Sequence, residues 1–170
     1  MKGSKKIIPV NTPKISNYEK KYVNECLKTN WISSEGKFVK LFEEKFSKFN
    51  DRKYGVAVSS GTAALEVAIK SLNLKKNSEV LIPSFSIIST ANAVIKNNLK
   101  PVLIDCDLDT WNVNINQTLK KITKKTKAII ITHIYGLPVN MDKILNVAKK
   151  NKIIVIEDAA EVIGLKYKDK

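Results

Sequence analysis

From Tyr54 onward, short apolar runs alternate with helical patterns, and this alternation limits the fold more than any other feature of the chain. The apolar runs lie at 54–58, 80–82, 101–104, 128–132 and 153–156. Helical patterns separate most of them, at 62–72, 89–97, 117–123 and 141–150. Strands that alternate with helices build right-handed βαβ units, in which helices cover both faces of a parallel sheet. The predicted fold class is therefore α/β, a mostly parallel sheet flanked by helices.

The residues before this alternating region have a different pattern. Apolar side chains at helical spacing predict helices over 17–27 and 37–49, and the turn-rich segment WISSEG at 31–36 predicts a loop between them. The sequence thus divides into a helical segment, 1–53, and an α/β domain, 54–170. A chain of 170 residues is long enough to bury the core of one such domain.

Composition narrows the function classes. The net charge is +14, but Arg52 is the single arginine and the lysines are spread along the chain. Specific readout of phosphates and bases favours arginine, so we expect no nucleic-acid partner. No apolar run approaches the ~18 residues of a membrane span, and the N-terminus lacks a signal-peptide pattern, so we expect no membrane partner and a cytoplasmic location. Cys26 and Cys106 match no metal or redox spacing and are expected to be buried free thiols.

Ligands of parallel sheets bind outside the carboxyl ends of the strands, so the polar residues that follow each apolar run are the candidates. The first run leads into SSGTAAL and then a helix. Gly61 allows close backbone approach, and the helix start offers free N–H groups that suit a phosphate. Simple N-capping by Ser60 or Thr62 explains the same residues equally well. The chain contains neither a Walker A loop nor the G-x-G-x-x-G fingerprint.

The last run ends in EDAAE, where Asp158 follows a buried strand. A carboxylate in that position needs a partner, and a protonated pyridine nitrogen is one that fits. The alternatives are an aspartate that caps the next turn or a metal ligand in an unrelated α/β fold. Glu161 lies three residues further on and reaches the same ligand if the chain turns back.

Three further polar residues follow strands. The single histidine, His133, has no nucleophile motif beside it, and a lone histidine is more often structural than catalytic. We favour a neutral imidazole that lines the cofactor pocket. Asp105 and Asp107 offer a pair of carboxylates that suits Mg²⁺, but with Thr110 and Trp111 following them we favour turn and cap roles.

These blocks together resemble the DegT/DnrJ/StrS aminotransferases, and among them the GDP-perosamine synthases. The resemblance is carried, in this order, by SSGTAAL, IPSFSIISTANAV, PVLIDCDLDTWNV, KAIIITHIYGLPVNMDKI and VIEDAAEVIG, and it runs from near Ile8 to the end of the chain. It implies the large domain of a fold-type-I transferase whose cofactor is pyridoxal 5'-phosphate. Residues 54–170 would be an incomplete cofactor-binding domain, and 1–53 a helical segment with a substrate-side loop.

The resemblance also implies roles for individual residues. Gly61, Thr62 and Ala63 would hold the cofactor phosphate, Asp158 would bind the pyridine nitrogen, and Glu161 would lie beside the 3-hydroxyl of the ring. Ile87 occupies a position where the family often has an aromatic residue on the pyridine face, and an isoleucine covers the ring without π-stacking. Ser33 and Ser34, in the WISSEG loop, are candidate substrate contacts.

The Schiff-base lysine of the family follows an S-F-x-x-x-K stretch that is not found before Lys170. We therefore expect no catalytic residue in this chain, and we expect the chain to be a piece of a longer, homodimeric enzyme. The resemblance implies that the enzyme transfers an amino group from glutamate to a nucleotide-linked keto-sugar, with GDP-4-keto-6-deoxymannose favoured. Such a piece should expose an unpaired, apolar sheet edge. The alternatives are a sugar dehydratase of the same fold with histidine in place of the lysine, a non-catalytic fragment that needs a complementary chain, and a Rossmann-type binding module.

Overall fold

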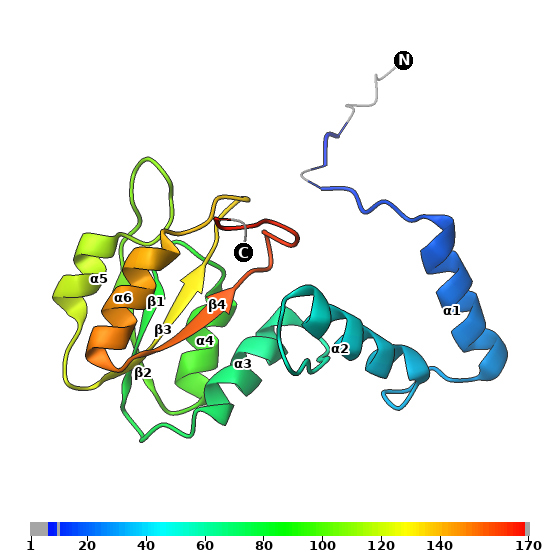
Figure 1. Ribbon diagram of the computed structural model, residues 1–170, viewed down its shortest axis with the longest axis horizontal. Helices are drawn as coiled ribbons and strands as arrows, with labels where there is room; N and C mark the ends of the chain where they lie inside the picture. Colours follow the sequence, from blue (N-terminus) through cyan, green and yellow to red (C-terminus); the bar gives the residue numbers. More distant parts are fainter. Residues whose placement is uncertain (1–6, 10, 169–170) are drawn as a thin grey trace, which may run out of the picture. The chain divides into compact units, whose positions relative to one another are not determined.

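The computed structural model describes residues 7–9 and 11–168, and the chain forms two compact units, Met1–Ala57 and Val58–Lys170 (Figure 1). The first unit is helical, and the second is an α/β unit. Within the described residues, no helix combines the length and the apolar character that a membrane span requires.

The first unit contains helices α1 (Asn17–Thr29) and α2 (Lys37–Phe49). A capping box starts α1: Ser16 Oγ accepts a hydrogen bond from Tyr18 N–H at 3.1 Å, and the Glu19 carboxylate accepts one from Ser16 N–H at 2.7 Å. The two helices meet where the Tyr22 and Phe38 rings lie 5.2 Å apart. Neither α1 nor α2 contains a buried residue, so their apolar stripes are not covered within this unit.

The predicted strand at 54–58 is wrong. The segment is extended but joins no sheet in the described part of the chain, and Tyr54 and Val56 are 75% and 74% exposed. The segment is hydrogen-bonded to α2 instead, since Ala57 N–H donates to Glu43 Oε1 at 2.8 Å. Gly55 lies so close to α2 that an added Cβ would stand 2.7 Å from the carbonyl oxygen of Glu43. Apolar, β-prone residues permit a strand, but a strand also needs a neighbour with free N–H and C=O groups.

The second unit holds a four-stranded parallel sheet in the order β2-β1-β3-β4. The predicted helices and the four remaining strands are confirmed to within about two residues at each end. Their bounds are α3 (Gly61–Ser71), β1 (Glu79–Pro83), α4 (Ile88–Lys96), β2 (Lys100–Ile104), α5 (Ile115–Lys121), β3 (Thr126–Thr132), α6 (Met141–Asn151) and β4 (Ile154–Asp158).

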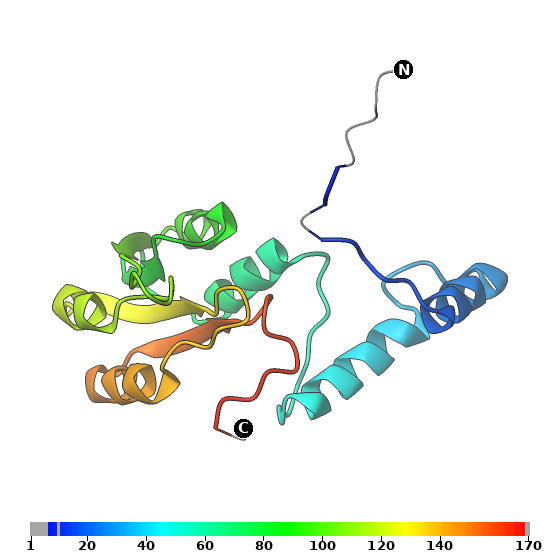
Figure 2. The ribbon, with the colours of Figure 1, turned by 90° about the horizontal axis from the view of Figure 1, so that it is seen from above.

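Two cores form, one on each face of the sheet. Alternate strand residues point to opposite faces, so Val80, Ile82 and Ile130 pack with α3 and α4, whereas Leu81 and Ile131 pack against the α5–α6 side. Helix α6 runs alongside β3 and β4 (Figure 2). The three-layer α/β architecture expected from the sequence is therefore confirmed.

Strand β4 forms one edge of the sheet, because within the described residues it pairs with β3 alone. Its apolar side chains are only partly covered, and Ile154 is 43% exposed. The unpaired apolar edge that the sequence predicts is present in this unit.

Candidate functional site

The topology points to one end of the sheet. The chain passes from β1 outward to β2, then returns to the other side of β1 to form β3, so the direction of winding reverses between β1 and β3. Ligands of open parallel sheets bind at such switch points, beyond the carboxyl ends of the strands. There the hydroxyls of Ser86, just after β1, and Thr132, the last residue of β3, lie 3.2 Å apart.

Helix α3 brings a set of backbone donors to this end. Ser60 is its N-cap, and its Oγ accepts a hydrogen bond from Ala63 N–H at 3.2 Å. The capping role that the sequence left open therefore falls to Ser60. The N–H groups of Gly61 and Thr62 have no recorded acceptor within the described residues, and the space beside Gly61 is open, since an added Cβ would meet nothing within 4 Å. Free N–H groups at the positive end of a helix dipole suit a phosphate.

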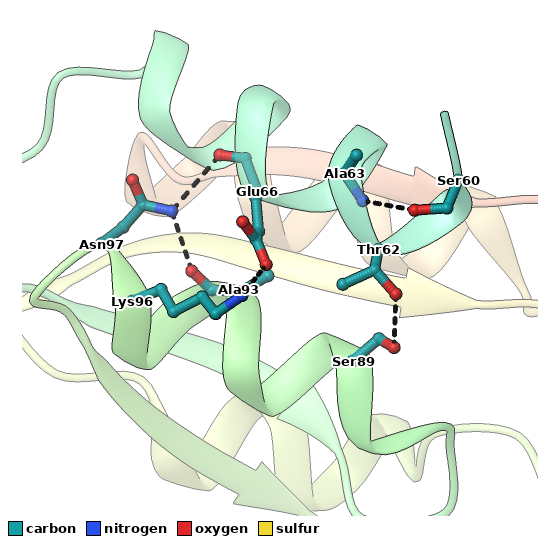
Figure 3. Close-up of polar contacts among 8 residues, drawn as sticks. All are labelled: Ser60, Thr62, Ala63, Glu66, Ser89, Ala93, Lys96 and Asn97. Carbon is teal, nitrogen blue, oxygen red and sulfur yellow. Dashed lines mark hydrogen bonds and ion pairs between the residues drawn. The ribbon is translucent and has the colours of Figure 1, made fainter. Parts of the chain in front are cut away.

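A neighbouring helix contributes a hydroxyl to the same place. Thr62 Oγ1 lies 2.8 Å from Ser89 Oγ, on the first turn of α4 (Figure 3). Ile87 is the N-cap of α4 and offers no side-chain acceptor to that helix. Its side chain is 65% exposed, so it presents apolar surface beside the hydroxyl groups.

Asp158 ends β4 and is the register partner of Thr132 at the end of β3. One carboxylate oxygen, Oδ1, accepts a hydrogen bond from Ala160 N–H at 3.2 Å, which is the turn-capping role considered from the sequence. The other oxygen receives no hydrogen bond within the described residues and can accept one from a protonated ring nitrogen. Asp158 therefore combines both roles that the sequence left open.

Glu161 is exposed, and its Oε2 accepts a hydrogen bond from Tyr135 N–H at 2.5 Å. The carboxylate thereby connects the segment after β4 to the loop after β3. The candidate cofactor residues therefore lie at one end of the sheet, at the start of a helix or at the end of a strand: Gly61, Thr62, Ala63, Ile87 and Asp158. Glu161 reaches the same end through its contact with the loop after β3.

His133 does not line this site as expected. Its Nδ1 accepts a hydrogen bond from Val139 N–H at 3.1 Å, so the neutral ring carries its proton on Nε2, which lies 3.4 Å from Glu157 Oε2. Val139 belongs to the core on the α6 side, whereas Thr132 contacts Ser86 on the α4 side. The imidazole is buried on the opposite face because side-chain direction alternates along an extended chain.

Asp105 and Asp107 act in turns. Asp107 Oδ1 accepts hydrogen bonds from Asp109 N–H at 3.1 Å and from Thr110 at 3.4 Å, and Asp105 Oδ1 accepts one from Cys106 N–H at 2.9 Å. Within the described ranges, no cluster of three or more potential metal-ligating side chains occurs. Cys106 and Cys26 are free thiols but only half-buried, so full burial was a wrong expectation.

An aromatic cluster of Phe85, Trp111 and Tyr135 was not expected from the sequence. The Phe85 ring lies 5.1 Å from that of Trp111 and 6.4 Å from that of Tyr135. Both partners have left-handed backbones, with φ of 58° and 50°. Buried Asn112 ties their two loops together, since it donates to Leu137 O at 3.0 Å and accepts from Ile134 N–H at 3.1 Å. The one available signal was the position of all three residues shortly after strands.

Ser33 and Ser34 belong to the first unit and lie in the loop between α1 and α2. Both are exposed. Ser33 lines an open, mostly apolar groove of about 630 Å³ in this unit, together with Cys26, Trp31 and Phe38. The role of Ser33 and Ser34 in substrate contact stays a prediction.

A phosphorylated pyridine fits the donor set at the end of the sheet. The free N–H groups and the Thr62 hydroxyl at the start of α3 can donate hydrogen bonds to a phosphate, and a carboxylate oxygen of Asp158 at the end of β4 can accept one from a ring nitrogen. The sequence matches the DegT/DnrJ/EryC1/StrS aminotransferase family model over residues 13–170. The chain belongs to this family.

Relatives within the DegT/DnrJ/EryC1/StrS family are considerably longer than this chain. The GDP-perosamine synthase of Escherichia coli O157:H7 is 42% identical over 165 residues, which are 97% of this chain and 45% of that enzyme. The GDP-perosamine synthase of Caulobacter vibrioides is 40% identical over 163 residues, 96% of this chain and 44% of that enzyme. The chain thus spans about half the length of the curated relatives it matches.

Two solved structures of enzymes that are 30% and 27% identical to this chain share its fold. A GDP-4-keto-6-deoxy-D-mannose-3-dehydratase of E. coli with bound hydrated PLP has a TM-score of 0.89 and 30% identity, over 95% of this chain and 43% of that one. A 3-amino-5-hydroxybenzoic acid synthase has a TM-score of 0.88 and 27% identity, over 93% of this chain and 41% of that one. This chain therefore has the fold of part of a fold-type-I large domain, and pyridoxal phosphate is the cofactor of the family to which it belongs.

Proposed function

We propose that this chain is the cofactor-binding part of a pyridoxal-phosphate-dependent aminotransferase that acts on a nucleotide-linked keto-sugar. Within it, 54–170 would be the incomplete cofactor domain and 1–53 the substrate-side segment. The observation that supports this most is that uncommitted N–H groups of α3 and the free oxygen of Asp158 meet the same end of one parallel sheet.

The chain's own residues then have distinct tasks. The N–H groups of Gly61 and Thr62 and the Thr62 hydroxyl bind the phosphate, with Ala63 completing the turn. The carboxylate of Asp158 would accept a hydrogen bond from the protonated ring nitrogen and so favour the charged form of that nitrogen. Pyridoxal phosphate, when bound, supplies an electron sink for the transfer of the amino group.

Two side chains would complete the surroundings of the ring. Ile87 would cover one ring face by apolar contact, because its side chain is exposed and it lies two residues before Ser89, whose hydroxyl contacts Thr62. Glu161 stands beside the 3-hydroxyl, held through its contact with Tyr135 N–H. Ser33 and Ser34 would contact the sugar nucleotide.

The proposed reaction moves the amino group of glutamate to GDP-4-keto-6-deoxymannose, since two GDP-perosamine synthases are among the relatives at 40% identity or above. The lysine that this chemistry requires is proposed to lie outside the 170 residues. No residue of this chain is therefore proposed as catalytic, and a homodimeric enzyme located in the cytoplasm stays a prediction.

A sugar dehydratase of the same fold is the second candidate. It is favoured by the similarity to the E. coli dehydratase, whose TM-score of 0.89 rests on 95% of this chain. A histidine at the position of the family's lysine would indicate it. A non-catalytic piece that needs a complementary chain is the third candidate.

The test begins with the protein purified from its native source, whose intact mass decides between a longer chain and one of 19.1 kDa. It is then incubated with GDP-4-keto-6-deoxymannose and glutamate labelled with nitrogen-15 in the amino group. A sugar nucleotide that carries the label supports the aminotransferase, whereas an unlabelled product that has lost an oxygen indicates the dehydratase. Asp158→Ala should abolish either reaction, and an active variant would refute the site.

A further inference from the structure

We infer that Ser89 is a positioning residue for Thr62: it donates its hydroxyl proton to Thr62 Oγ1 and so aims the Thr62 O–H at the cofactor phosphate. This inference rests on the proposed cofactor site. It adds a residue of α4 that touches no ligand atom itself.

The geometry brings the two hydroxyls together from separate helices. Ser89 Oγ lies 2.8 Å from Thr62 Oγ1, and both residues are half-buried (Figure 3). Ser89 is not the cap of its own helix, because the N-cap of α4 is Ile87. Its recorded side-chain hydrogen bond within the described chain goes to α3, 27 positions earlier in the sequence.

Proton counting fixes the direction of this contact once a phosphate is present. A hydroxyl has one hydrogen to donate and two lone pairs that accept. A phosphate dianion only accepts, so Thr62 must donate its single hydrogen to the phosphate. The 2.8 Å contact then persists only if Ser89 donates to Thr62. In this arrangement Ser89 also polarises the Thr62 hydroxyl, which strengthens its bond to an anion.

A second set of contacts holds α3 and α4 together further along. Lys96 Nζ lies 2.6 Å from Glu66 Oε1 (Figure 3). Asn97 Nδ2 donates to Glu66 O at 3.3 Å and to Ala93 O at 2.8 Å. Two polar contacts at separate points along α3 oppose its rotation against α4. The Ser89 hydroxyl is therefore presented to Thr62 in a fixed position.

Pyridoxamine 5'-phosphate is the suitable probe, because it has no aldehyde to react with the many lysines of the chain. Its affinity for the 170-residue chain is measured by fluorescence titration and compared with that of pyridoxamine, which lacks the phosphate. Ser89→Ala should weaken the phosphorylated probe ~3- to 10-fold, the range of one lost hydrogen bond, and leave pyridoxamine binding unchanged. Ser89→Thr should restore the affinity, and Ser71→Ala, at the far end of α3, is the matched control.

A double-mutant cycle separates positioning from general packing. In a Thr62→Val background, Ser89→Ala should change the affinity less than ~2-fold, because the hydroxyl it serves is already gone. Ser89→Cys, similar in size but a weak donor, repeats the test if the alanine variant does not fold. An equal loss in both backgrounds, or an equal loss for pyridoxamine, overturns the inference alone. If the unaltered chain binds both probes equally, the proposed cofactor site fails as well.

Discussion

Thr123 donates its hydroxyl hydrogen to Glu79 Oε2 at 2.6 Å, at the end of the sheet opposite the candidate site. Glu79 is a buried carboxylate at the start of β1, and Lys100 lies 3.2 Å from its other oxygen. The Thr123 hydrogen bond lowers the pKa of Glu79 below its usual range, against the opposing effect of burial and with help from Lys100. This end of the sheet therefore depends on a charged glutamate.

The lowered pKa predicts how stability depends on pH. A carboxyl whose pKa is depressed in the folded state stabilises the fold above its unfolded pKa of about 4.3, and this contribution is lost as pH falls through the lower, folded pKa. Glu79→Gln should therefore lower the melting temperature at pH 7, and the difference between the two proteins should shrink as the pH is lowered below about 4.3. Thermal unfolding of both proteins across this range checks the prediction. A difference in melting temperature between the unaltered chain and the Glu79 variant that stays constant with pH would contradict the prediction.

The buried side chain of Asn112 should be essential for the two loops that carry Trp111 and Tyr135. Asn112→Ala removes both of its hydrogen bonds and leaves Leu137 O and Ile134 N–H without them. We expect a loss of about 1–3 kcal/mol in the free energy of unfolding, the range for unsatisfied buried groups. Urea unfolding measures this loss.

The control for Asn112 is Asn151→Ala, because Asn151 is exposed and bonds only to Val147 O of its own helix in the described chain. A Trp31→Phe background leaves Trp111 as the one tryptophan fluorophore. Its emission should shift toward that of a solvated indole in the Asn112 variant and not in the Asn151 variant. Identical spectra would mean that Asn112 does not hold the loop.

Gly61→Ala should separate stability from ligand binding. The added methyl meets no atom within 4 Å, and alanine is the better helix former, so the melting temperature should hold or rise slightly. The same methyl occupies the space proposed for the phosphate, so affinity for pyridoxamine 5'-phosphate should fall at least ~10-fold, the effect of losing ~1.4 kcal/mol. A stable variant with unchanged affinity would place the phosphate elsewhere.

The uncovered edge strand β4 predicts self-association of the 170-residue chain. Unpaired strand edges with apolar side chains recruit other edges, and a lysine on the edge opposes this. Ile154→Lys should therefore shift the chain toward monomer, because Ile154 is 43% exposed at the start of β4. Sedimentation velocity across a concentration series reports the change. A chain that is already monomeric and unfolds cooperatively would refute the prediction.

Sequence periodicity located most helices and strands because each of them repeats a local pattern of burial. It failed at Tyr54–Val58, where the residues suit a strand but no neighbour is available within the described chain. The expectation that His133 lines the cofactor pocket took no account of side-chain direction, and one position along an extended chain reverses the side. The hydroxyl of Ser89 could not be found from sequence, since its contact with Thr62 depends on how α3 and α4 pack.

The candidate site divides in the same way. Gly61, Thr62 and Asp158 follow strands or start a helix, so their place at one end of the sheet follows from topology alone. The cluster of Phe85, Trp111 and Tyr135 instead depends on left-handed backbone at two aromatic residues, which no propensity favours. Interactions between loops are therefore the part that local sequence rules do not reach.

Helices α1 and α2 bury none of their residues, and this has a calorimetric consequence. Phe42, Phe46 and Trp31 remain 55%, 41% and 55% exposed to water. Water around such side chains raises the heat capacity, and removing it lowers the heat capacity. A protein surface that binds these apolar stripes will therefore give a negative heat-capacity change. Calorimetric titrations at several temperatures measure this change as the slope of the binding enthalpy against temperature, so they can detect such a partner before it is identified.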